Sequence, residues 1–124
     1  MRRPLLIMVL VVLVAVPCAV FSTGTGQLTQ VSAYPNPFDS RQEKTKIAYT
    51  LSEDRGVAVD IYSVYGARVW NCSIPPAVLG GRRGANYLTW DGRGSRGRKV
   101  AKGVYLAVVR AGSARTVVKI GVIH

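Results

Sequence analysis

The sequence predicts an all-β protein: a seven-stranded antiparallel immunoglobulin-like β-sandwich that follows an N-terminal signal peptide helix. Beyond residue 24, apolar residues recur at every second position, and no stretch repeats them at helical spacing over three turns. Glycine, proline and asparagine separate these runs at short intervals, which is typical of turns between strands. A chain of 124 residues supplies one domain at most.

The first 22 residues have the order of a secretory signal peptide. Arg2 and Arg3 precede an uncharged apolar run, Leu5–Val16, and small residues follow Pro17. An uncleaved membrane anchor and a lipoprotein acylated at Cys18 are the alternatives, but the run is short for a bilayer and Pro17 makes a poor lipidation motif. We therefore expect an exported protein of the periplasm, outer surface or extracellular space, with no membrane span after cleavage.

Residues 23–33 are expected to form a short N-terminal segment ahead of the sandwich, which occupies residues 34–124. The segment contains a weak, polar first strand, Gln27–Ala33. The next strand, Lys46–Leu51, is amphipathic, because three apolar side chains share one of its faces: Ile47, Tyr49 and Leu51.

A β-hairpin is expected next, from Val57–Tyr65 and Arg68–Ile74. The pair Tyr65-Gly66 supplies its tight turn, since glycine adopts a positive φ readily. In the first of these strands Val57, Val59 and Ile61 share one face, and Asp60 lies on the other. Pro75-Pro76 ends the hairpin, because proline cannot donate to a strand ladder.

Three more strands complete the expected sandwich. Residues 80–86 form a loop, Tyr87–Asp91 a short strand, and Gly92–Lys102 a second, basic loop. Gly103–Arg110 is apolar on both faces and is therefore predicted to be a central strand. After a turn at Ala111-Gly112-Ser113, Arg115–Ile123 is the last strand.

Three segments, in this order, resemble one known family. They are Tyr34-Pro35-Asn36-Pro37-Phe38 with the strand after it, residues 59–69, and Thr89-Trp90-Asp91-Gly92 with Gly103-Val104-Tyr105. Together they resemble the Ig-like domain of the flagellar hook-capping protein FlgD, and the related C-terminal sorting domains of proteins exported by the type IX secretion system. The resemblance runs from about Val31 to the C-terminus. It implies a non-catalytic secreted module that acts in export, cell-surface attachment or protein assembly, with protein partners in that process.

The motif residues all have structural explanations. Pro35 and Pro37 make the entry to the sandwich a stiff linker. Tyr34 and Phe38 flank that linker and are placed to pin it down. Gly103 is expected where a side chain would clash. The full set of motif residues is Tyr34, Pro35, Asn36, Pro37, Phe38, Tyr62, Gly66, Trp90, Asp91, Gly92, Gly103 and Tyr105.

The sequence offers no catalytic constellation. Its only histidine is His124, at the last position, which excludes histidine-centred triads and two-histidine metal sites. Six acidic residues are present, but their spacing places no pair in one cleft. We therefore predict no catalytic residues, no cofactor and no metal, and expect the protein not to be an enzyme.

The basic charge is the one open functional feature. The net charge is +11, and it falls to +9 once Arg2 and Arg3 leave with the leader. Seven of the remaining cations lie in the two late loops: Arg82, Arg83, Arg93, Arg96, Arg98, Lys99 and Lys102. Because these loops flank one short strand, they belong at its opposite ends unless the longer loop folds back.

One explanation is that these charged loops are solvated and keep a small secreted domain soluble. The alternative function is a small secreted binding protein that uses them for an anionic glycan, lipopolysaccharide or another polyanion. Nucleic acid is disfavoured, because the basic stretch contains no aromatic residue and the chain is expected to be exported.

Overall fold

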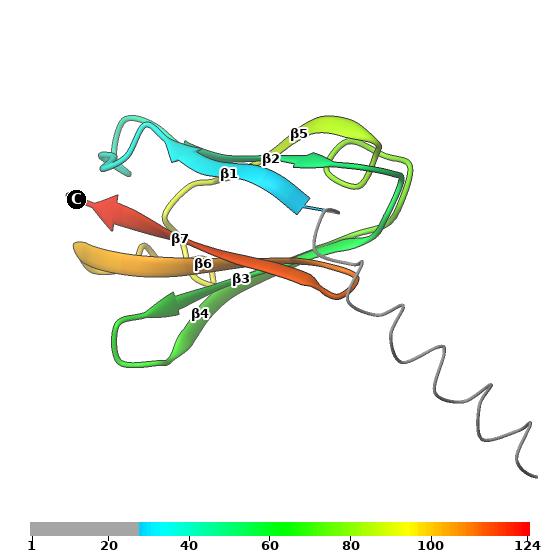
Figure 1. Ribbon diagram of the computed structural model, residues 1–124. Coiled ribbons are helices and arrows are strands. Elements are labelled where there is room, and N and C mark those ends of the chain that lie inside the picture. The colour runs from blue at the N-terminus through cyan, green and yellow to red at the C-terminus, as the bar shows by residue number, and fades with distance from the viewer. Residues whose placement is uncertain (1–27) are drawn as a thin grey trace, which may run out of the picture.

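The computed structural model describes residues 28–124, which form two antiparallel sheets packed face to face (Figure 1). The predicted signal peptide at 1–22 lies outside these residues. The three-stranded sheet has the order β1-β2-β5, with β1 at Leu28–Tyr34, β2 at Thr45–Leu51 and β5 at Gly84–Trp90. The four-stranded sheet has the order β4-β3-β6-β7, with β4 at Arg68–Ile74, β3 at Val57–Ser63, β6 at Gly103–Ala111 and β7 at Ala114–Val122. The predicted seven-stranded β-sandwich is confirmed.

The core lies where the alternation placed it. The inward-facing residues of β2, β3 and β6 are buried: Ile47, Tyr49, Leu51, Val57, Val59, Ile61, Tyr105, Ala107 and Val109. The β6 strand pairs with both β3 and β7, as expected of a strand with two apolar faces. Within residues 28–124, no helix is long and apolar enough to cross a membrane.

The fifth strand begins earlier than the sequence suggested. Residues 80–86 were expected to be a loop, but β5 starts at Gly84, and Gly84, Ala85 and Asn86 pair with β2. Asn86 is buried, and its side chain supports the turn before it: Oδ1 accepts from the Gly80 amide at 2.9 Å, and Nδ2 donates to the Arg82 carbonyl at 2.7 Å. Because Asn86 is polar although it faces inward, the pattern of apolar residues did not reveal this end of the strand.

The hairpin strand β3 ends at Ser63 instead of Tyr65. The Gly66 amide donates to the Ser63 carbonyl at 3.0 Å, which begins the turn there. Gly66 has the expected positive φ of 87°. Tyr65 is 93% exposed at the tip of the hairpin.

The linker before β2 is fixed to the last strand. Phe38 is fully buried and forms a parallel bridge with Val122, in which the Phe38 amide donates to the Gly121 carbonyl at 2.9 Å. The Asn36 side chain bonds the same strand twice, because Nδ2 donates to the Lys119 carbonyl at 2.7 Å and Oδ1 accepts from the Gly121 amide at 2.8 Å. Phe38 therefore pins the linker as expected.

Two of the expected roles of motif residues are wrong. Tyr34 does not pin the linker, since its side chain is 57% exposed. Gly103 does not avoid a clash, because a Cβ there would meet no heavy atom within 4 Å. Its φ of 149° explains the glycine instead, since other residues rarely adopt that conformation.

Tyr49 should make the stability of the sandwich sensitive to alkaline pH. Its hydroxyl donates to the Gly80 carbonyl at 2.6 Å, and burial raises the pKa of Tyr49 from 10.0 to about 12. A raised folded pKa means that the stabilisation is complete below pH ~10, the pKa of an unfolded tyrosine, and is lost as the pH rises through the folded pKa.

We therefore expect the urea concentration at the midpoint of unfolding to fall as the pH rises from 10 to ~11.5. The fall should be less steep in Tyr49→Phe, and urea unfolding of both proteins across this pH range checks this. Burial also raises the pKa of Tyr105, so some slope remains in the variant. Identical slopes in both proteins would contradict the prediction.

Candidate functional site

The basic loop after β5 begins with a rigid turn. The Trp90 indole Nε1 donates to the Arg93 carbonyl at 2.9 Å, and the Arg93 amide donates to Asp91 Oδ1 at 3.0 Å. Between them Gly92 has a φ of 78°, and a Cβ there would come within 2.7 Å of Ser40 Cβ. The Trp90-Asp91-Gly92 motif thus builds the turn, as the sequence suggested.

The tip of this loop folds on itself and docks on β4. The Gly94 amide donates to the Arg98 carbonyl at 2.8 Å, and the Arg93 side chain donates to the Gly97 carbonyl at 2.7 Å. The Ser95 amide donates to the Val69 carbonyl of β4 at 2.9 Å. The loop is therefore held against the four-stranded sheet, and the main chain that carries its exposed arginines has a fixed position.

The seven cations predicted to bind a polyanion do not form one patch. Arg82 and Arg83 precede β5 and the others follow it, so the two groups lie at opposite ends of that strand. Arg93 is 3.7 Å from the Asp91 carboxylate, and Lys99 donates to the Ser40 carbonyl at 2.7 Å. Lys102 is exposed just before β6.

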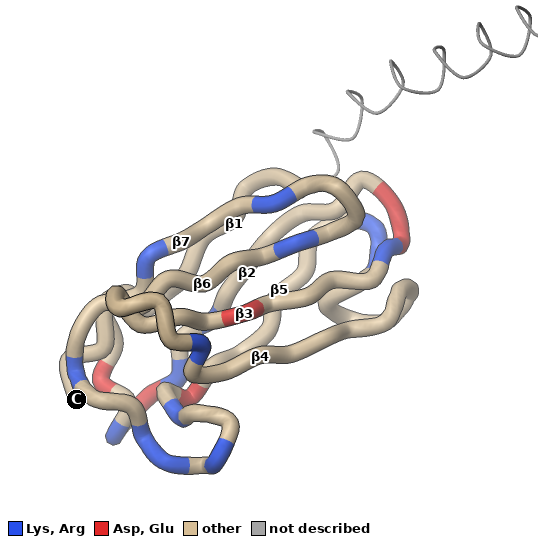
Figure 2. The backbone as a smooth tube through the Cα atoms, turned by 90° about the horizontal axis from the view of Figure 1, so that it is seen from below, with Lys and Arg blue, Asp and Glu red and all other residues tan. Residues whose placement is uncertain are grey.

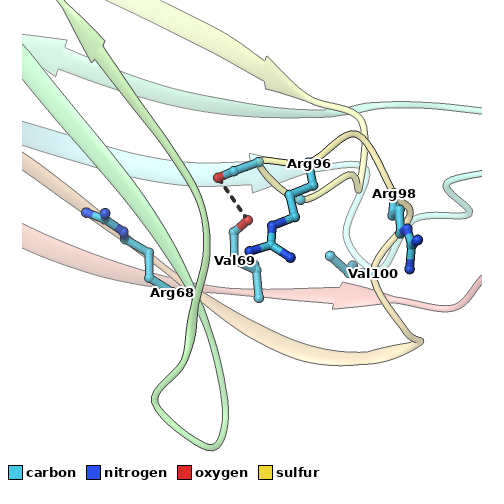
Figure 3. A pocket seen from close by; sticks show the side chains of 7 residues that line it. Arg68, Val69, Arg96, Arg98 and Val100 are labelled. Carbon is cyan, nitrogen blue, oxygen red and sulfur yellow. Dashed lines mark hydrogen bonds between the residues drawn. The ribbon is translucent and has the colours of Figure 1, made fainter.

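Only two of the seven, Arg96 and Arg98, line the hollow between this loop and β4 (Figure 3). It has a volume of about 680 Å³. Its third arginine, Arg68, comes from β4 and was not among the predicted residues. The lining consists of Arg68, Val69, Gly94, Ser95, Arg96, Arg98 and Val100, with no acidic residue.

Asp60 is the unexpected feature of the adjoining sheet face. It lies on the outer face of β3, as the alternation predicted, yet it is only 5% exposed. Arg68 Nη1 is 3.4 Å from Asp60 Oδ1, and Arg110 Nη2 is 2.7 Å from Asp60 Oδ2. Both arginine side chains are about half exposed. Asp60 and Arg68 belong to the predicted hairpin, but Arg110 lies 50 residues further along the chain in β6, so the sequence alone did not indicate that the three side chains meet.

The described residues hold no group of three or more His, Cys, Asp or Glu side chains that could bind a metal ion. His124 is exposed, and its carbonyl accepts from the Ser40 amide at 3.1 Å. The three arginines that line the hollow carry guanidinium groups, which can recognise negative charge.

Neither a protein-family model nor a curated protein matches the chain in sequence. Solved structures do match it in fold. PorZ of Porphyromonas gingivalis, described as an essential bacterial surface component of the type-IX secretion system, has a TM-score of 0.53 at 22% identity over 76% of this chain. Latent dimeric PorU from the same organism gives 0.56 at 24% identity over 74%. FlgD from P. aeruginosa gives 0.52 at 19% identity over 68%.

The match covers only part of each of these proteins: 11% of PorZ, 9% of PorU and 62% of FlgD. The chain therefore has the fold of one module within these larger proteins. The FlgD-like and type IX-like fold expected from the three sequence segments is confirmed at the level of the fold.

Proposed function

We propose that this protein is a non-catalytic secreted module that acts in export, cell-surface attachment or protein assembly. The observation that carries the proposal is the shared fold with modules of PorZ, PorU and FlgD. Its partners are then other proteins of export or surface assembly. The arginine-lined hollow supports a binding role over catalysis, since none of the residues lining it can act as a general base at neutral pH.

A passenger experiment tests the export role. A reporter enzyme with its own signal peptide is fused ahead of residues 23–124 and expressed in a bacterium that has a type IX secretion system. We expect the reporter at the cell surface or in the medium, and in the periplasm when that system is deleted.

The reporter alone and a fusion carrying the Trp90→Ala module are the controls, and both should stay in the periplasm. If all three proteins reach the same compartment, the module adds nothing to export, and the proposed role is wrong.

A further inference from the structure

Five arginines from four separate segments line two hollows that share Arg68, and we call this set the arginine row: Arg96, Arg98, Arg68, Arg110 and Arg115. Arg68 joins its two halves. It lines the 680 Å³ hollow with Arg96 and Arg98, and a second hollow of about 340 Å³ with Arg110 and Arg115. The second hollow lies on the outer face of the four-stranded sheet, which Figure 2 views from below.

The row carries uncompensated positive charge. Asp60 is the one acidic residue lining either hollow, and Arg68 and Arg110 already hold its two oxygens. Among residues 28–124, no carboxylate lies within ion-pair distance of Arg96, Arg98 or Arg115.

The β6–β7 hairpin adds to this excess. Arg110 and Arg115 are direct cross-strand partners, a position in which like charges repel. An anion bound between them would relieve that repulsion. A ligand with several negative charges can therefore form favourable contacts with more than one arginine of the row.

The length of the arginine row favours an extended ligand, and such a ligand would contact the arginine side chains and not the main chain. The row crosses β4, β3, β6 and β7, which are neighbours in the sheet. Arg68 pairs with Tyr62, whereas Arg115 lies opposite Arg110, which pairs with Ala58, so Arg68 and Arg115 are offset by about 14 Å across the strands and by about 13 Å along them. A peptide that binds by strand addition needs the main-chain groups of a sheet edge. The face crossed by the row offers none, because its central strands β3 and β6 are paired on both sides.

The residues between the arginines favour sugars over nucleic acid. Val69, Val100 and Val108 line the two hollows, and the one aromatic residue there, Tyr62, is half-buried. Single-stranded nucleic acid binds through exposed aromatic rings on which its bases stack. Guanidinium groups need no such platform, since they bind carboxylate, sulfate or phosphate groups in a bidentate manner.

We propose that the arginine row binds a linear acidic polysaccharide whose negative groups contact Arg96 and Arg98 at one end and Arg115 at the other. This binding does not depend on the export role, and the passenger experiment does not test it.

The test compares two triple variants of the purified protein that lose the same charge. The row variant is Arg96→Ser, Arg98→Ser and Arg115→Ser, which leaves Arg68 and Arg110 on Asp60. The control variant is Arg82→Ser, Arg83→Ser and Lys46→Ser. In it, two changes are at the other end of β5, and Lys46 lies over the Tyr87 ring in the other sheet. The probes are heparin and polygalacturonate, with oligodeoxythymidylate as the nucleic acid arm.

We expect the wild-type protein to bind both polysaccharides, and the row variant to bind them roughly tenfold more weakly at ~0.1 M salt. The control should change by about twofold or less. Equal losses in the two variants would mean that only net charge matters, and would overturn the proposal. Tighter binding of oligodeoxythymidylate than of either polysaccharide would overturn it too. If the row variant has a lower melting temperature than the wild-type protein, the double variant Arg96→Ser and Arg98→Ser, in the exposed loop, replaces it. Its loss of polysaccharide affinity is then compared with that of the control in the same way.

Discussion

Replacing Trp90 by alanine is expected to lower the free energy of unfolding by about 3–5 kcal/mol, enough to unfold much of a small domain. Trp90 is 1% exposed, and its ring stands edge-on to Phe38 and to Tyr105, with centroids 5.8 Å away in both cases. The substitution therefore opens a large cavity between the sheets. It also leaves the Arg93 carbonyl without its indole donor.

Urea unfolding followed by circular dichroism measures this loss. Thr89→Ala is the matched control, because Thr89 is the exposed neighbour on the same strand, and a change within about 0.5 kcal/mol is expected there. Trp90→Phe should lie between the two, since it keeps an aromatic ring but removes the N–H donor. A Trp90→Ala protein with the wild-type midpoint would show that this stack is not the centre of the core.

The second large effect is expected where Asp60 loses both of its arginines. In Arg68→Ala with Arg110→Ala, a carboxylate that is 5% exposed is left without either ion-pair partner. Stranding one partner of a buried ion pair costs about 3–5 kcal/mol. Because both arginines are half exposed, we expect the lower value of ~2–3 kcal/mol here.

Adding Asp60→Val to that double variant should restore most of the lost stability, because the uncompensated charge is then gone and valine suits a strand. Arg115→Ala serves as the control, since Arg115 lines the same hollow without an ion pair to Asp60. Thermal melts of the four proteins check the order. A triple variant as unstable as the double one would assign the loss to the packing of the arginine stems.

Alternation predicted the strands well because each sheet buries one face. It failed where a strand begins with residues that do not alternate, as at Gly84-Ala85-Asn86. There the buried Asn86 satisfies its amide with main-chain groups of its own turn, a local arrangement that no hydrophobic pattern records.

The candidate site was predictable only in part. Arg96 and Arg98 stand out in the sequence because they lie in one glycine-rich loop. Arg68, Arg110 and Arg115 do not, because they are single residues of three different strands. Strand order brings them together, and strand order follows from long-range pairing that alternation alone leaves undetermined. Burial of Asp60 was missed for the same reason.

The attachment of the linker to the last strand has a consequence for how the chain folds during synthesis. Phe38 and Ser40 find their main-chain partners only at Gly121–His124, more than 80 residues later. Contacts of such sequence separation form late. Residues 121–124 must therefore leave the ribosome before Phe38 can be covered, and until then the aromatic side chains of the core stay accessible to chaperones.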